Sequence, residues 1–291
     1  MNDRAAAAAS LPDRIAFLGF GLIGGSIALA IREAGYRGWI SAWTPGGRGP
    51  LEGRERGIVD DHAVAAEDAI QAAALVILAG PPLATLAAVA DPRLPGSGAL
   101  ITDVASTKAR IVEAANASSL RFVGGHPMAG RETTGFGSAT ADLFVDRPWV
   151  VVPGARASTD DAGTVDALAA ATGARPIRLD AVAHDHAVAA ISHLPLVLSA
   201  ALVEAVAGKG ARDWPLARAL AAGGWRDMSR LARGDVEMGE GILATNAAAV
   251  ASRLRDVRAV VDRWIVDLDG PPSDEALRER LQAARDALER E

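Results

Sequence analysis

The sequence predicts an α/β chain in which a doubly wound parallel sheet is followed by an all-helical domain. An apolar run at residues 15–18 leads into a glycine-rich turn and an amphipathic segment. Short apolar runs and helix-like segments then alternate up to about residue 180, and beyond that point only helical patterns remain. The 291 residues, 50% of them hydrophobic, are enough for two domains of ordinary size.

The expected elements alternate as a parallel sheet requires. Strands are predicted at residues 15–18, 38–43, 74–79, 99–102, 121–123, 149–152 and 176–179, with helices at residues 22–34, 82–89, 106–115 and 160–171 and a flexible loop at 45–49. Helices broken by glycine and proline follow at residues 184–207, 215–222, 239–268 and 273–290, the last with Ser273 as N-cap. This divides the chain into a flexible tail (1–12), a first domain (13–180) and a helical domain (181–291).

The turn after the first strand carries Gly19, Gly21 and Gly24 in G-x-G-x-x-G spacing. Gly19 permits the turn, Gly21 lets the backbone approach a pyrophosphate, and Gly24 lets helix and strand pack closely. The helix N-terminus offers free N–H donors to an anion. The motif predicts a Rossmann-type dinucleotide site. Four further residues would border this site. They are Leu22 and Ile23 at the start of the first predicted helix, and Gly80 and Pro81 after the strand predicted at residues 74–79.

The identity of the dinucleotide depends on the end of the second strand. Thr44 occupies the place where an acid usually binds the ribose 2′-hydroxyl, and no acid lies between Glu33 and Glu52. Arg48 lies in the following loop, and a threonine hydroxyl with a guanidinium would bind a 2′-phosphate that an acid would repel. The expected cofactor is therefore NADP, with NAD as the alternative, because a surface arginine often has no specific partner.

Composition restricts the partners and the location. The formal charge of −6 argues against nucleic acid, and the absence of cysteine excludes disulfides and thiolate metal sites and fits the cytoplasm. The sequence shows no secretory signal, and it has no run of about 18 uninterrupted apolar residues that could form a membrane-spanning helix. We therefore expect no membrane association. His184 and His186 lack a third ligand nearby, so no metal is expected. Helices as apolar as residues 191–202 favour a homodimer that covers them.

Three polar stretches are not explained by core packing. In TDVASTK, Ser106 precedes a predicted helix, where it could be only an N-cap. In GGHPMAG, His126 is expected in an extended loop that leaves its imidazole uncovered. His193 in an apolar helix and Arg230 in GGWRDMSRLARGD could each be functional, or a core histidine and a salt-bridged surface arginine.

Taken in order, these motifs resemble the prephenate and arogenate dehydrogenase family of tyrosine biosynthesis over roughly residues 14–260. The resemblance rests on LGFGLIGGS, TDVASTK, GGHPMAG followed by Glu132 and Gly135, HDHAVAAISHLP and GGWRDMSRLARGD. Members of that family carry a nucleotide-binding domain and a helical dimerisation domain. The resemblance implies an NAD(P)-dependent oxidoreductase that oxidises and decarboxylates prephenate or arogenate, giving 4-hydroxyphenylpyruvate or tyrosine.

The resemblance also implies roles for particular residues. His126 would act as general base on the ring hydroxyl, and Ser106 would position that hydroxyl. Arg230 would hold a substrate carboxylate. Three other residues match substrate-pocket positions of the family: His193, Glu132 and Asp227.

Two departures from the family pattern favour the arogenate-using, NADP-dependent branch. Leu196 follows Pro195 where many prephenate-specific members read S-H-L-P-H. Gly239 follows Met238 where many of them have tryptophan.

Two other functions stay open on the residues alone. A β-hydroxyacid-type dehydrogenase would need a catalytic lysine in the helical domain, and Lys209 lies there only in a glycine-flanked loop. A non-catalytic nucleotide sensor would leave His126 and His193 without a chemical role.

Overall fold

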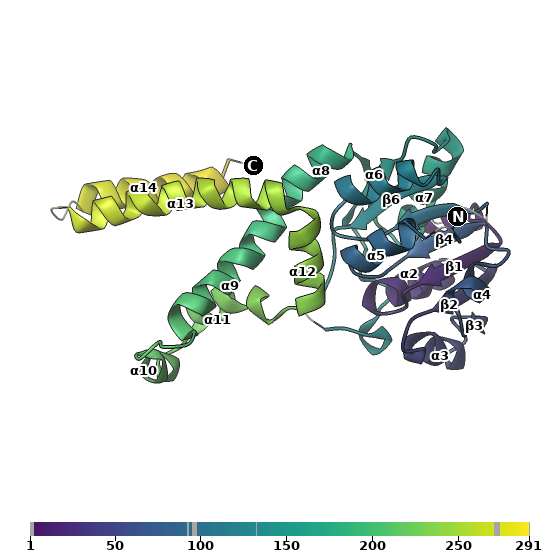
Figure 1. Ribbon diagram of the computed structural model, residues 1–291, viewed down its shortest axis with the longest axis horizontal. Helices are drawn as coiled ribbons and strands as arrows, with labels where there is room; N and C mark the ends of the chain where they lie inside the picture. The colour runs from purple at the N-terminus through teal and green to yellow at the C-terminus, as the bar shows by residue number, and fades with distance from the viewer. Residues whose placement is uncertain (1–2, 92, 95–97, 132, 271–273, 291) are drawn as a thin grey trace.

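The computed structural model describes residues 3–91, 93–94, 98–131, 133–270 and 274–290. An eight-stranded sheet in the order β3-β2-β1-β4-β5-β6-β7-β8 forms the N-terminal domain, from which the helical domain extends to one side (Figure 1). The strands pair in parallel apart from β6 and β7, which are antiparallel. The predicted combination of a doubly wound domain and a helical domain is confirmed.

The strands are β1 (Arg14–Leu18), β2 (Trp39–Trp43), β3 (Asp61–His62), β4 (Leu75–Leu78), β5 (Leu100–Asp103), β6 (Phe122–Pro127), β7 (Pro148–Pro153) and β8 (Arg175–Arg178). Helices of the first domain are α1 (Asp3–Ala9), α2 (Leu22–Glu33), α3 (Arg48–Glu55), α4 (Ala66–Ile70), α5 (Pro82–Val89), α6 (Ala109–Ala117), the 3₁₀ turn η2 (Phe136–Ser138) and α7 (Thr159–Ala171). The helical domain comprises α8 (Ala181–Val188), the π-helical turn η3 (Ala189–His193), α9 (Leu194–Ala207), α10 (Trp214–Ala219), α11 (Gly223–Ser229), η4 (Leu231–Arg233), α12 (Val236–Thr245), α13 (Ala247–Asp269) and α14 (Asp274–Leu288).

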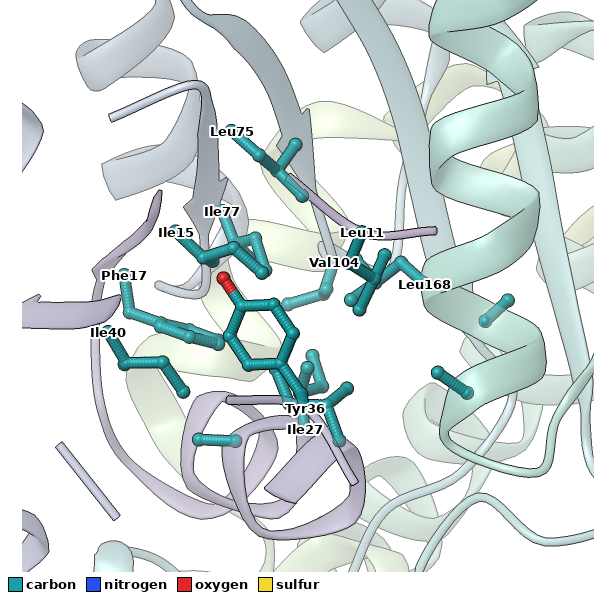
Figure 2. Close-up of a cluster of buried hydrophobic side chains, with 14 of the residues drawn as sticks. Leu11, Ile15, Phe17, Ile27, Tyr36, Ile40, Leu75, Ile77, Val104 and Leu168 are labelled. Atoms are coloured by element: carbon teal, nitrogen blue, oxygen red, sulfur yellow. The ribbon is translucent and has the colours of Figure 1, made fainter. Parts of the chain in front are cut away.

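The central strands are buried on both faces, since helices cover both sides of the sheet. Alternate residues enter different cores: Ile15 and Ile77 pack on one face, whereas Val76 packs on the other. On the first face these side chains meet Ile27 of α2 and Leu168 of α7 (Figure 2). This apolar scaffold fixes the carboxyl ends of β1, β4, β5 and β6, where the polar motifs lie.

The prediction of a flexible tail at residues 1–12 is wrong for the part that the structure describes. Residues 3–9 form α1, which packs against α7. Ala8 is 1% exposed, and Arg4 donates a hydrogen bond to the carbonyl oxygen of Ala171 at 3.2 Å. Alanine has the highest helix propensity, and the partner that covers this run lies more than 150 residues away, so local composition could not reveal it.

Three other differences concern where helices begin and where they are divided. The predicted loop at residues 45–49 ends earlier, because α3 begins at Arg48. α11 begins directly at Gly223, where a break between helices is expected from the sequence. The helix predicted at residues 184–207 is divided by the π-helical turn η3 just before Pro195. The N-cap prediction for Ser273 lies outside the described residues.

The segment Ala181–Ala207 is long and apolar enough to cross a membrane by length and composition alone, with a mean hydropathy of 1.8. It also contains His184 and Asp185, which are buried in polar contacts with the first domain. Core helices of soluble proteins meet the same criterion, so this finding is weak evidence of a membrane span.

Candidate functional site

The turn between β1 and α2 is built around three glycines. Gly19 has a φ of +100°, and a Cβ there would lie 2.6 Å from the backbone of Ala79. A Cβ on Gly24 would lie 2.5 Å from the carbonyl oxygen of Gly19. At Gly21, in contrast, a Cβ would meet no described atom within 4 Å. The turn is therefore closed toward the protein and open toward a ligand at the one position where a pyrophosphate would approach.

The N-terminus of α2 is suited to an anion. Gly21 is its N-cap, and none of the described side chains caps it by a hydrogen bond. The amides of the first turn, including those of Leu22 and Ile23, are thus available to phosphate oxygens. Gly80 and Pro81 follow β4, and Pro81 is the N-cap of α5. Since the strand order reverses between β1 and β4, this edge is the ligand-binding crevice of such sheets.

Thr44 and Arg48 lie beyond the end of β2, at the same edge of the sheet. The carbonyl oxygen of Thr44 accepts a hydrogen bond from the amide of Gly47 at 2.9 Å. Arg48 is exposed and donates to the carboxylate of Glu52 at 2.7 Å within α3. A 2′-phosphate at this place would compete with Glu52 for the guanidinium.

His126 lies on β6, and the expectation of an uncovered loop imidazole is wrong. β6 continues to Pro127 because β7 pairs with it, with His126 opposite Val150. The side chain is only 8% exposed, and its Nδ1 lies 2.9 Å from Nε2 of His184 on α8. The covering residue comes from the helical domain, 58 positions along the chain.

Asp185 joins the two domains beside this pair of histidines. Its carboxylate accepts hydrogen bonds from the amides of Lys108 at 2.7 Å and Ala109 at 2.9 Å, at the N-terminus of α6. It also lies 2.8 Å from Nδ1 of His184. Burial would raise the pKa of Asp185, but the hydrogen bonds from His184 and the two amides outweigh it and hold that pKa below its ordinary value.

An ion pair between Lys108 and Asp103 supports the loop between β5 and α6. Both side chains are fully buried, and Nζ of Lys108 donates to Asp103. Asp103 also accepts from the amides of Ala105 at 3.0 Å and Gly125 at 3.1 Å. The pair thereby ties the loop that carries Ser106 to the residue preceding His126. Burial lowers the pKa of Lys108, and the neighbouring Asp103 carboxylate acts in the opposite direction without cancelling this effect.

His193 lies in the π-helical turn and belongs to the same buried polar cluster as His126, His184 and Asp185. It is 1% exposed, and its Nδ1 lies 3.2 Å from Nδ2 of Asn246, which also donates to the carbonyl oxygen of Asp185 at 2.8 Å. The backbone of Ser106 faces its ring. Nε2 of His193 is buried and has no hydrogen-bond partner among the described residues. A buried, unpaired nitrogen at this place fits a polar atom of a ligand.

Two histidines, His126 and His193, are neutral near pH 7. Burial lowers the pKa of His126 well below 6.5, helped by the charges that His184, Lys108 and His193 would carry. Burial also lowers the pKa of His193 to about 4, against the opposing effect of Asp185. A neutral imidazole can accept a proton from a substrate hydroxyl.

We expect acid to destabilise the protein through these histidines. Both have folded-state pKa values below the unfolded value of about 6.5, so below that pH the unfolded chain binds more protons. Stability is therefore retained above about pH 6.5 and falls as the pH decreases toward 5. Urea midpoints across this window measure the effect. His193→Asn should flatten the pH dependence, whereas a change at the exposed His186 should leave it intact; equal profiles for all three proteins would contradict the assignment.

Two further predicted site residues lie on or beside α11. Asp227 lies on α11 and Arg230 caps its C-terminus; both are exposed, and α11 packs against α9 and η4. Glu132 lies outside the described residues. Their roles stay predictions.

Sequence reasoning missed His184, Asp185 and Asn246 as site residues. In the sequence, His184 and His186 suggest a metal site that lacks a third ligand, and the motif HDHAVAAISHLP assigns no role to His184 or Asp185. Asp180 caps α8 through the amides of Val182 and Ala183, and such a cap is a recognisable start signal. It fixes the helix register, but the contact partner of His184 is not visible in the local sequence.

Comparison with known proteins identifies both domains. The model of the prephenate dehydrogenase nucleotide-binding domain matches residues 27–178, and that of the prephenate dehydrogenase dimerization domain matches residues 180–282. The prephenate dehydrogenase of Bacillus subtilis (strain 168) is 33% identical over 266 residues, which cover 89% of this chain and 69% of that protein.

Two solved structures resemble the whole chain. The arogenate dehydrogenase of Synechocystis is 31% identical, with a TM-score of 0.76 and coverage of 95% of this chain and 99% of that one. The prephenate dehydrogenase of A. aeolicus, in complex with hydroxyphenyl propionate and NAD+, has a TM-score of 0.85 at 23% identity, with coverage of 95% and 97%. The second similarity supports the fold.

Proposed function

The chain belongs to the prephenate/arogenate dehydrogenase family, and we propose that it oxidises and decarboxylates arogenate with NADP+ to give tyrosine. As a member of this family it is an oxidoreductase that uses a nicotinamide dinucleotide. The observation that carries the assignment of the reacting site is the buried, neutral His126 at the carboxyl edge of the sheet, on which the glycine turn also lies.

The glycine turn, the N-terminus of α2 and the Gly80-Pro81 wall would hold the dinucleotide. When bound, the nicotinamide supplies the acceptor for the hydride that leaves C4 of the substrate ring. His126 accepts the proton of the C4 hydroxyl as that hydride leaves. Ser106, in the loop that the Asp103–Lys108 pair fixes, orients the hydroxyl toward the imidazole.

Decarboxylation follows from the product of this oxidation. The carboxylate carbon leaves as carbon dioxide, its bonding electrons aromatise the ring, and the ring oxygen takes the proton back from His126. Arg230 holds a substrate carboxylate with a guanidinium fork, and Glu132 and Asp227 steer that arginine. The reaction thus needs a reversible proton acceptor and a cationic anchor, and no metal.

The preference for arogenate rests on two residues that depart from the family pattern and lie together in space. A Cβ on Gly239 would lie 3.8 Å from Cδ2 of Leu196. Many prephenate-specific members have histidine and tryptophan at these two positions. In this chain Leu196 of α9 and Gly239 of α12 form an apolar contact there. The loss of a histidine from this place supports a substrate that carries an ammonium group in place of the ketone.

Four initial rates test the proposal. Purified protein is assayed with prephenate and with arogenate, each with NAD+ and with NADP+, by the absorbance of the reduced nicotinamide. Arogenate with NADP+ should give the highest kcat/KM. A higher value with prephenate or with NAD+ would correct the substrate or the cofactor, and no turnover with any pair would refute the activity.

Thr44→Asp should convert the cofactor preference. The new carboxylate repels a 2′-phosphate and can bind a ribose 2′-hydroxyl, so KM for NADP+ should rise about tenfold while KM for NAD+ falls. Thr44→Val is the matched control, because it removes the hydroxyl without adding a charge. An unchanged ratio of the two KM values in Thr44→Asp would show that this loop does not contact the cofactor.

Arg230→Ala should act mainly on substrate binding. Loss of a charge-assisted hydrogen bond worth about 1.5–3 kcal/mol corresponds to a rise of roughly 10–100-fold in substrate KM, with little change in KM for the cofactor. Arg226→Ala removes an exposed arginine from the same helix and serves as control. Equal kinetics for the two variants would remove Arg230 from the substrate site.

The protein is proposed to work as a cytoplasmic homodimer. Its second domain matches a dimerization domain, α13 exposes large apolar side chains in the single chain, and the apolar side chains of α9 are not fully buried there. Exposed examples on α13 are Val260, Val261, Ile265, Val266 and Leu268. A second copy that covers these helices would also account for the apolar character of Ala181–Ala207.

A further inference from the structure

Three side chains form a continuous hydrogen-bonded line across the junction of the two domains. His126 Nδ1 lies 2.9 Å from His184 Nε2, and His184 Nδ1 lies 2.8 Å from Oδ1 of Asp185. All three residues are buried. The line begins on β6 of the first domain and ends on α8 of the second, at the carboxylate that caps α6.

The bonding partners determine which nitrogen of each ring carries a proton. Asp185 accepts two backbone N–H groups and its pKa is depressed, so it is a carboxylate. It can only accept from His184, which therefore carries its proton on Nδ1. We take this as the ring proton of His184, so that its Nε2 is the acceptor in the 2.9 Å contact with His126 Nδ1. His126 must donate to it from Nδ1, which leaves the lone pair of His126 on Nε2.

We propose that Asp185 and His184 are positioning residues for the reaction, and that they hold His126 in the Nδ1–H tautomer with Nε2 as the base. This inference rests on the proposed function, since it takes His126 as the proton acceptor. It goes beyond that function by assigning the tautomer and the two residues that impose it.

The same line stabilises the charge that forms during turnover. When His126 Nε2 takes the hydroxyl proton, the positive charge of the imidazolium is shared through the hydrogen bond toward His184 and the Asp185 carboxylate. Lys108 and His193 also face His126, and a positive charge on either would oppose this step. The Asp103 carboxylate offsets Lys108.

Two substitutions of His184 separate positioning from mere packing. His184→Phe keeps a ring but cannot accept from His126, so kcat should fall about 10²-fold with substrate KM changed less than about threefold. His184→Gln offers a carbonyl oxygen near the position of Nε2 and should recover part of that loss. His186→Gln, an exposed residue on the same helix, is the matched control and should leave kcat unchanged.

A double-mutant cycle tests whether His184 acts through His126. In a His126→Asn background, His184→Phe should cause no further loss, because the ring that it positions is already absent. Multiplicative losses, or a wild-type kcat in His184→Phe, would overturn the proposal.

The tautomer can be read without substrate, by ¹⁵N NMR of the imidazoles in the full-length protein. The chain has five histidines, so single substitutions assign every ring. In the wild-type protein, His126 should be protonated on Nδ1 and unprotonated on Nε2. In His184→Phe, His126 should lose this tautomer preference. The opposite tautomer in the wild-type protein would refute the inference even if the enzyme turns over arogenate. A protein that oxidises neither substrate would refute the proposed function and leave the NMR result to decide the tautomer.

Discussion

Replacing His126 with asparagine is expected to lower kcat by about 10³-fold while substrate KM changes only a few-fold. Asparagine fits the polar position on β6 and can still donate to His184, but it cannot take a proton from the substrate hydroxyl. The loss should therefore appear in the chemical step. Steady-state kinetics with saturating cofactor, together with a deuterium isotope effect at C4 of the ring, measures it.

The control for this variant is His62→Asn. His62 lies on the edge strand β3, where its Nδ1 contacts Arg54 at 3.0 Å, away from the cluster around His126. It should keep wild-type kinetics. If His126→Asn also kept a normal kcat, His126 would not be the base, and the proposed reaction site would be wrong.

Removing the carboxylate of Asp103 is expected to have the largest effect on stability. Asp103→Ala leaves the Lys108 ammonium buried without its partner, and it also frees the amides of Ala105 and Gly125. Breaking a buried pair in this way costs about 3–5 kcal/mol of the free energy of unfolding. Urea denaturation followed by circular dichroism gives the value.

The pH dependence of the stability of Asp103→Ala shows whether the unpaired Lys108 ammonium causes the loss of stability. In Asp103→Ala, burial lowers the pKa of Lys108 without opposition from Asp103, while the unfolded chain keeps this proton up to about pH 10.4. The unfolded state then binds more protons, so the stability of the variant should rise as the pH increases toward that value. The double variant Asp103→Ala/Lys108→Met should lose this slope and regain most of the stability. A double variant as unstable and as pH-dependent as the single one would contradict this explanation.

Much of the first domain follows from local patterns. β1, the glycine turn and α2 are read from one stretch, since the apolar run, the glycine spacing and the helical periodicity occur together. The helix Pro82–Val89 begins with a proline, a strong start signal, and the structure has the same bounds as the prediction. The alternation of such units predicts a parallel, doubly wound sheet, because parallel strands need crossover connections.

The arrangement of the candidate site depends on contacts that no local pattern contains. His126 and His184 are 58 positions apart, and Lys108 and Asp185 are 77 apart. The sequence shows a histidine between glycines and proline and therefore favours an open loop. It does not show that β7 extends the pairing of β6 or that α8 covers the ring. Likewise, the alanine run at residues 5–9 does not show in the sequence that this segment packs as α1 against α7.

The proposed base of this oxidoreductase is Nε2 of His126, which would face the ring hydroxyl. A crystal structure of the dimer with NADP+ and the product tyrosine tests it most directly. We expect the phenolic oxygen of tyrosine within about 2.6–3.2 Å of His126 Nε2, with His126 Nδ1 hydrogen-bonded to His184 and the ligand carboxylate near Arg230. A phenolic oxygen out of reach of His126, or a tyrosine held elsewhere in the dimer, would contradict it.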